Sequence, residues 1–173
     1  MTIRKILTEP DPFLRQKSHD VDKVDNEIRK LMDDMLDTMY AAPGIGLAAI
    51  QVGIPKKIIV IDISKEKEKT PLYFINPKII FKSNNNTTYE EGCLSVPGQF
   101  AEIDRPDKCH INYLDYNGTP QKLKAEGLLA TCIQHEMDHL EGILFIDYLS
   151  KLKKSFIVKK LSKQKKSLER IVV

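Results

Sequence analysis

The stretch GLLATCIQHEMDHLEG, residues 127–142, constrains how the rest of the chain must fold. Its apolar residues recur with the spacing of a helix, and Gly142 is a residue type that commonly follows a helix end. Within this helix His135 and His139 stand one turn apart on the same face, so both can bind one metal ion. Glu136 is rotated from His135 by about 100° around the axis. It is poorly placed as a ligand, but it can reach a water on that metal.

A helical projection of this segment gives a buried arc and an outer face. A carboxylate on the buried arc needs a purpose there, because an unpaired buried charge is costly. The projection places Leu128, Cys132, His135 and His139 along one edge of the arc, Leu129, Ile133, Glu136 and Leu140 deeper in it, and Thr131, Gln134, Asp138 and Glu141 outward.

A catalytic metal site of the zinc type usually has three protein ligands and one open position. The place where one class of protease has its third histidine holds Phe145, and the only glutamate well downstream is Glu169. The other histidines, His19 and His110, fall in a polar N-terminal stretch and in an expected strand. The third ligand is therefore not one that the usual HExxH proteases use.

The segment EGCLSVPG, residues 91–98, offers a different third ligand. Cys93 follows a glycine and precedes a proline-bounded loop, where the backbone can turn a thiolate toward a metal. A loop cysteine alone is more often a small apolar residue, but a helix that lacks its third ligand favours ligation. Cys109 and Cys132 fall on the inner faces of a strand and a helix, so packing explains both.

A third segment, PGIGLAAIQVG at residues 43–53, combines glycines and small residues that allow a close approach of backbone or ligand. It lacks the GK[ST] ending of a phosphate-binding loop. Gln51 offers an uncharged amide donor, suited to a developing oxyanion. Its alternative interpretation is a polar surface residue after the loop.

The remaining pattern predicts an α+β fold with antiparallel sheets around the central helix and a helix at the C-terminus. Residues 26–41 carry a helical apolar stripe, with Asp25 or Asn26 as the cap. The other expected elements are strands at 58–63, 78–83, 108–116 and 121–127, polar turns at 65–70 and 83–88, a hairpin turn at Asn117-Gly118, and a helix at 152–170.

Length and composition indicate one compact domain of 173 residues. No apolar run approaches the roughly 20 residues that span a membrane, and no secretory signal precedes the body. Three cysteines without an export signal favour free thiols in the cytoplasm. We therefore expect a soluble cytoplasmic protein that binds neither a membrane nor DNA.

Charge divides the chain at about residue 150. Residues 151–173 carry a net +8, which leaves −5 on residues 1–150 out of a total of +3. We expect residues 1–150 to form the catalytic body and residues 151–173 a basic helix of the same domain.

Taken together, GIGLAAIQ, EGCLS and QHEMDHLEG resemble, in order, the three motifs of the peptide deformylases, and the similarity runs over nearly the whole chain. The EGCLS form and the basic C-terminus are similar to the bacterial type with an extended terminal helix. The resemblance implies the deformylase fold, cytoplasmic N-formylmethionyl nascent peptides as substrate, and formate as product.

The resemblance also implies roles for individual residues. Cys93, His135 and His139 would bind the metal, and Glu136 would be the general base and then the acid. Gln51 and the Leu94 backbone N–H would face the carbonyl oxygen. The residues implied around the substrate are Ile45, Gly46, Glu91, Arg105 and Cys132.

A metal-bound water attacks the formyl carbonyl in this chemistry, while donors hold the oxyanion. The family implies Fe(II) as the native ion, with zinc, nickel or cobalt able to occupy the site. A Cys/His/His set suits several first-row ions, so the residues do not choose among them.

Two other functions share part of this pattern. A zinc endopeptidase would cleave within unformylated peptides, and a ribosome- or RNA-associated protein would use a structural metal. Structural sites are closed by four ligands, which counts against the second. Formate release from a formylmethionyl peptide separates all three.

The basic C-terminal segment has two interpretations. Leu152, Phe156, Ile157, Leu161 and Leu168 form a narrow apolar stripe that would dock on the body, with the lysines in solvent. Alternatively, its charge attracts ribosomal RNA near the peptide exit, which would weaken steeply with salt.

Overall fold

The computed structural model describes residues 2–64 and 68–171, the last four of these by their backbone alone. Its helices are α1 (Asn26–Ala41), α2 (Gly127–Leu140) and α3 (Lys151–Ile171), with 3-10 helices η1 (Pro12–Arg15), η2 (Ala49–Val52) and η3 (Phe145–Tyr148). Its strands are β1 (Gly46–Ala48), β2 (Ile58–Ile61), β3 (Leu72–Lys82), β4 (Asn86–Cys93), β5 (Val96–Pro106), β6 (Lys108–Leu114) and β7 (Pro120–Glu126).

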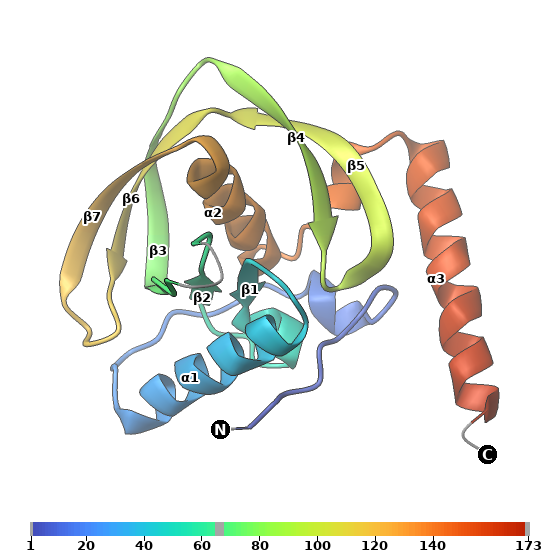
Figure 1. Cartoon of the computed structure of the whole chain (residues 1–173), viewed down its shortest axis with the longest axis horizontal. Coiled ribbons are helices and arrows are strands. Elements are labelled where there is room, and N and C mark those ends of the chain that lie inside the picture. Colours follow the sequence, from blue (N-terminus) through green and yellow to red (C-terminus); the bar gives the residue numbers. More distant parts are fainter. Residues whose placement is uncertain (1, 65–67, 172–173) are drawn as a thin grey trace.

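All strand pairings in these two sheets are antiparallel. Five strands form one sheet in the order β1-β2-β3-β6-β7, and β4 pairs with β5 as a separate ribbon. Figure 1 shows α2 enclosed between the two, with α1 packed below and α3 standing at the far side beside β5. The α+β fold with antiparallel sheets around a central helix is therefore confirmed.

Local sequence signals explain the elements that frame the site. The Asp25 carboxylate accepts a hydrogen bond from the Ile28 N–H and caps α1 at the predicted residue. Asp115 accepts from the backbone N–H groups of Asn117 and Thr119 in the β6–β7 turn, where Gly118 has φ +82°. The predicted hairpin is therefore present, with its glycine in the left-handed region.

Three buried clusters hold these layers together. One lies between α2 and the five-stranded sheet and includes Phe74, Ile111 and Ile133. A second lies between α1 and the sheet, and a third joins β5, η3 and α3. The central helix α2 also contacts β1, β2, β5, β6 and β7, so it is packed on several sides at once.

That enclosure corrects the helical projection. Thr131 and Gln134 were expected to face outward but are buried. The end of β5 covers Gln134. Gln134 Nε2 donates to the carbonyl oxygens of Pro106 at 2.9 Å and Ala130 at 3.0 Å. Leu128, expected on the buried arc, is 41% exposed.

Two strand boundaries also differ from expectation. The strand predicted at 78–83 begins six residues earlier, at Leu72. The turn predicted at 83–88 is shorter, since Asn86 already pairs with Pro106 in the β4–β5 ribbon. Pairing with a partner strand overrides the polar composition there.

Helix α3 contacts the body along only part of the predicted stripe. Leu161 is buried and Ile157 half-buried against the third cluster, together with Val158, which the stripe did not include. Leu152 and Phe156 are exposed instead, at 82% and 71%, and the side chain of Leu168 lies outside the described residues. Over the part of the chain that the structure describes, no helix combines the length and apolarity needed to cross a membrane.

Candidate metal centre

Three side chains from two elements converge on one point. Cys93 is the last residue of β4, while His135 and His139 project from α2. One donor atom from each lies within 4.8 Å of the others, and Cys93 Sγ is 3.2 Å from His139 Nε2. A thiolate and two imidazoles at this separation form a donor set that suits a first-row divalent ion.

The β4–β5 turn directs the Cys93 sulfur toward the helix. The strand register shifts between Gly92 and Cys93, and Cys93 then pairs with Val96 across the turn. The Ser95 N–H donates to Cys93 Sγ at 3.4 Å. The predicted flexible loop is therefore a tight turn that holds the sulfur in place.

The His135 ring is oriented from behind by Glu91. Its Nδ1 lies 2.9 Å from Glu91 Oε2. An ionised carboxylate only accepts hydrogen bonds, so Nδ1 carries the proton and Nε2 is left available to bind a metal ion. Such a carboxylate–histidine pair is the usual support of a metal-binding histidine.

Arg105 holds Glu91 in turn. Its Nε and Nη2 donate to the two carboxylate oxygens of Glu91 at 2.5 and 3.0 Å. Burial alone would raise the pKa of Glu91, but the bonds from His135 and Arg105 hold that pKa below its usual value. Glu91 is therefore an anion that keeps its acceptor role.

Glu136 lies on the next position of α2 and has a different environment. It is 4% exposed, and its Oε2 has no hydrogen-bond partner among the described residues. Burial raises the pKa of this carboxyl to about 7, although His135 lowers it. A poorly solvated carboxylate with a free oxygen is a competent proton acceptor.

Strand β1 leaves room for Glu136 only because residue 46 is glycine. A Cβ on Gly46 would lie 2.5 Å from Glu136 Oε1 and 3.0 Å from Cys132 Sγ. Burial raises the pKa of Cys132, so its thiol stays protonated beside Glu136. Gly46 therefore permits the close approach of β1 to α2.

Gln51 is fixed at both ends of its amide. Its Oε1 accepts from the Ala48 N–H at 2.8 Å, and its Nε2 donates to Ser95 Oγ at 3.0 Å and lies 3.5 Å from Cys93 Sγ. The amide therefore presents N–H donors, rather than its oxygen, beside the sulfur. Leu94 follows Cys93 in the turn, so its backbone is next to the same point.

A cavity of about 500 Å³ opens in front of these groups. Its wall includes two of the three convergent side chains, Cys93 and His135, while His139 lies behind them. The other predicted residues on its wall are Ile45, Gly46, Gln51, Glu91, Leu94, Cys132 and Glu136.

Arg105 is the predicted site residue that the structure places elsewhere. It is buried behind Glu91 and is absent from the cavity wall. Its guanidinium is fully engaged by carboxylates, so it supports the site rather than contacting a bound molecule.

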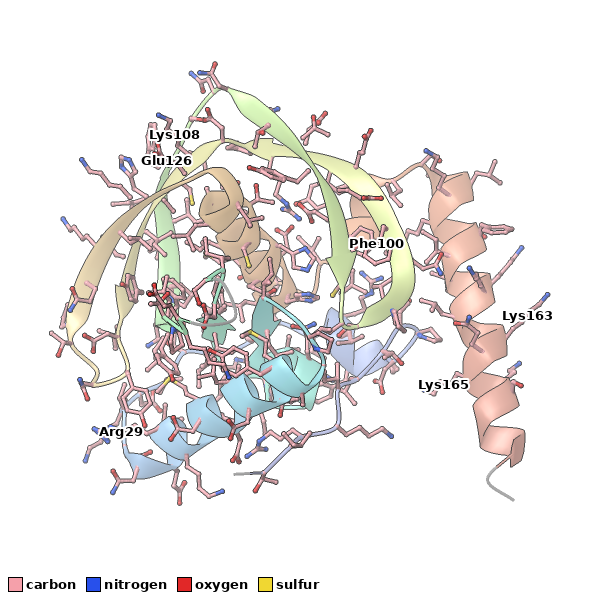
Figure 2. The ribbon with its side chains drawn as sticks, viewed as in Figure 1. Arg29, Phe100, Lys108, Glu126, Lys163 and Lys165 are labelled. Carbon is pink, nitrogen blue, oxygen red and sulfur yellow. The ribbon has the colours of Figure 1, made fainter. Side chains whose placement is uncertain are left out.

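Several residues at the site escaped the sequence analysis. Ser95 is fully buried and anchors Gln51. Phe145, which has no donor atom for a metal, stacks on the His135 ring at 6.3 Å between centroids. Phe100 on β5 lies beside β4 and lines the cavity (Figure 2). Phe145 was noted in the sequence only as a position without a ligand, and no local pattern indicated Ser95 or Phe100.

Known proteins resemble this chain along almost its whole length. The family model described as polypeptide deformylase matches residues 3–155. A peptide deformylase from Pelagibacter ubique is 67% identical, with 100% of both chains covered. The crystal structure of a peptide deformylase from Ehrlichia chaffeensis superposes with a TM-score of 0.92 at 45% identity, covering 96% of this chain and 98% of that one. A second structure from that organism, in complex with actinonin, has a TM-score of 0.91 at 48% identity, with coverage of 95% and 98%.

Proposed function

The chain belongs to the polypeptide deformylase family, and from that premise we propose that it hydrolyses the formyl group from N-formylmethionine of newly made polypeptides with the help of one metal ion. The observation that carries this proposal is the convergence of Cys93, His135 and His139 beside a buried glutamate with a free oxygen. The proposed location is the cytoplasm, where such chains are made.

The proposed metal ligands are Cys93, His135 and His139. Three ligands and an adjoining cavity leave a coordination position open, as catalytic sites require. A divalent ion bound there would polarise the formyl carbonyl and acidify the attacking water. Fe(II) is the expected ion, with zinc, nickel or cobalt as substitutes, because the donor set accepts all of them.

Glu136 is proposed to move the proton. Its free Oε2 accepts a proton from the attacking water and then returns it to the leaving amine. A pKa near 7 supports both steps, since the group gains and loses a proton easily near neutral pH.

Two donors are proposed to hold the developing negative charge on the formyl oxygen. One N–H of the anchored Gln51 amide binds Ser95, and its second N–H, on the Cys93 side, is the proposed donor and needs no reorientation of the amide. The Leu94 N–H is the second donor, at the turn that follows the cysteine.

The substrate is proposed to lie in the cavity. Its wall offers apolar side chains for the methionine, among them Ile45, Cys132 and Leu128. Gly46 has no side chain to fill the space beside Glu136. Glu91 contributes by holding His135 rather than by contacting the substrate.

Formate release from a formylmethionyl peptide tests the proposal. The wild-type chain should release formate, and Glu136→Gln should keep the metal while losing about 10²- to 10⁴-fold in turnover. Glu141→Gln is the matched control, since Glu141 ends the same helix but pairs with Lys17 at the surface.

Two results would contradict the proposal. Cleavage within unformylated peptides without formate release would indicate an endopeptidase. Near-normal turnover in Glu136→Gln would remove the proposed base.

Helix α3 is proposed to belong to the catalytic domain and to bring the enzyme to the ribosome. Its buried side packs on the body through Ile157, Val158 and Leu161. On the opposite side Lys159, Lys163 and Lys166 are exposed, and Figure 2 shows Lys163 pointing away from the body. These lysines are free to meet ribosomal RNA while the apolar side stays docked.

Ribosome co-sedimentation at low and high salt tests this partner. A chain that ends near Lys151 would also lose the buried Leu161 and the Lys154–Asp147 ion pair, so its loss of binding is ambiguous. Replacing Lys159, Lys163 and Lys166 together by glutamine leaves the docked side intact.

The matched control changes three exposed lysines of the sheet, Lys78, Lys122 and Lys124, to glutamine. Only the α3 variant should lose low-salt binding. Equal co-sedimentation of both variants with the wild type would eliminate this face of α3 as the contact.

A further inference from the structure

The hydrogen bonds behind His135 continue past Arg105 to the surface of the molecule. Arg105 uses its third donor, Nη1, to bind Asp138 Oδ2 at 2.8 Å. Asp138 stands one turn after His135 on α2. The arginine therefore ties the carboxylate that orients His135 to a second carboxylate on the same helix.

Tyr148 closes this chain of contacts at its outer end. Its hydroxyl donates to the same Asp138 Oδ2 at 2.8 Å. Its ring lies over the Arg105 guanidinium, 4.9 Å from the carbon Cζ. Tyr148 is itself 52% exposed, whereas Arg105 is 4% exposed, so the ring helps to cover the guanidinium.

The balance of charge shows why a neutral donor is needed there. One guanidinium faces two carboxylates, Glu91 and Asp138. Each carboxylate also accepts a hydrogen bond from one further side chain. Glu91 takes its extra hydrogen bond from His135, and Asp138 takes its extra one from Tyr148. Without the tyrosine hydroxyl, Asp138 would attract the Arg105 guanidinium more strongly, and the hydrogen bonds from Arg105 to Glu91 would weaken.

We propose that Tyr148 is a positioning residue for the metal centre, acting through Asp138, Arg105 and Glu91 on the orientation of the His135 ring. It touches neither the cavity nor the three ligands, so its effect is indirect. This inference rests on the proposed metal site.

The short helix η3 places Tyr148 beside Asp138 and Arg105. It is the last residue of η3, and α3 begins three residues later at Lys151. The same short helix carries Phe145, which stacks on His135 from another direction. The segment between α2 and α3 therefore contacts the ligand ring directly at one end and through the hydrogen-bonded chain at the other.

The test is Co(II) binding by Tyr148→Phe, a change that keeps the ring over Arg105 and removes only the hydroxyl. Removing a direct partner of a metal ligand usually costs 10- to 100-fold in affinity, so we expect a loss of about 3- to 10-fold this far from the metal. The visible spectrum of the Co(II) form should shift, and kcat should fall with KM unchanged.

Tyr116→Phe is the matched control. The Tyr116 hydroxyl also donates to an aspartate, Asp33 at 3.1 Å, but that pair joins the β6–β7 turn to α1, away from the metal centre. This variant should bind Co(II) as the wild type does. Equal losses in both variants would mean a general effect on the fold and would overturn the proposal.

A double-mutant cycle with Asp138→Asn tests whether the effect travels along the chain of contacts. If Tyr148 acts through Asp138, the double variant should bind Co(II) no more weakly than Asp138→Asn alone. Strictly additive losses, or wild-type affinity in Tyr148→Phe, would overturn the assignment.

The two proposals fail in different ways. If the wild-type chain binds Co(II) but releases no formate, and Tyr148→Phe binds Co(II) more weakly, the results would support this inference and contradict the proposed reaction. A wild-type chain that binds no Co(II) would overturn both.

Discussion

Gly46→Ala is the perturbation whose effect follows most directly from the packing around Glu136. The added Cβ would lie 2.5 Å from Glu136 Oε1 and 3.0 Å from Glu136 Cδ, whereas ordinary contacts of a Cβ are 3.4 Å or longer. The Cβ of residue 46 and the Glu136 carboxyl group must therefore move apart by about 1 Å. Strand β1 is held by pairing of Gly46 with Ile61 on β2, so the carboxyl group is the part that yields.

Both stability and rate should respond. Overpacking of this kind costs about 1–3 kcal/mol, which lowers the Tm of a domain of this size by roughly 2–12 °C. A misplacement of about 1 Å in a catalytic group costs on the order of 100-fold in rate. The metal should remain, because the atoms nearest to the new methyl group belong to Glu136 and Cys132 rather than to the three proposed ligands.

Formate release and metal content measured on the same samples check this expectation. Gly44→Ala is the control, since its Cβ would meet the flexible end of the Leu94 side chain at 2.7 Å rather than a catalytic carboxyl. It should lose less than about 10-fold, as that side chain can rotate away. A Gly46→Ala enzyme with kcat within about 3-fold of the wild type would refute the reasoning about Glu136.

Two further outcomes are expected. Cys93→Ala should lose bound metal and activity together, while Cys109→Ala, buried in the sheet, should keep both; stoichiometric metal in folded Cys93→Ala would contradict the ligand assignment. An Fe(II) form should lose activity in air, because iron or thiolate is oxidised, and a proven iron form that survives prolonged exposure would exclude this.

The parts of the fold that could be predicted are those with a local cause. Helix α1 follows from its apolar stripe and the Asp25 cap, and the β6–β7 hairpin follows from Asn117-Gly118. The convergence of Cys93 with the two histidines was also expected, since the missing third ligand of the helix required a donor from elsewhere.

The parts that could not be predicted depend on distant partners. The polar residues from Asn86 onward form β4 because β5 pairs with them one by one. Gln134 has the spacing of an outer residue, and it is buried only because the end of β5 supplies the Pro106 carbonyl oxygen. Tyr148 contacts Asp138 and Arg105 across three elements, and no spacing in the sequence indicates such a meeting.

The buried carboxylates differ in how their burial is compensated, and Glu136 is the one whose burial lowers the stability of the fold. Glu91 is neutralised by Arg105, and Asp34 by Arg4, so each recovers part of its desolvation energy from a cation. Glu136 is buried to the same degree, yet among the described residues it pairs with no cation and its Oε2 accepts no hydrogen bond. A fold under selection for stability alone would replace or pair this group, because an unsatisfied buried carboxyl is destabilising. Its persistence next to two candidate ligands, with a glycine opposite that admits it, is physical support for a catalytic role that does not depend on family resemblance.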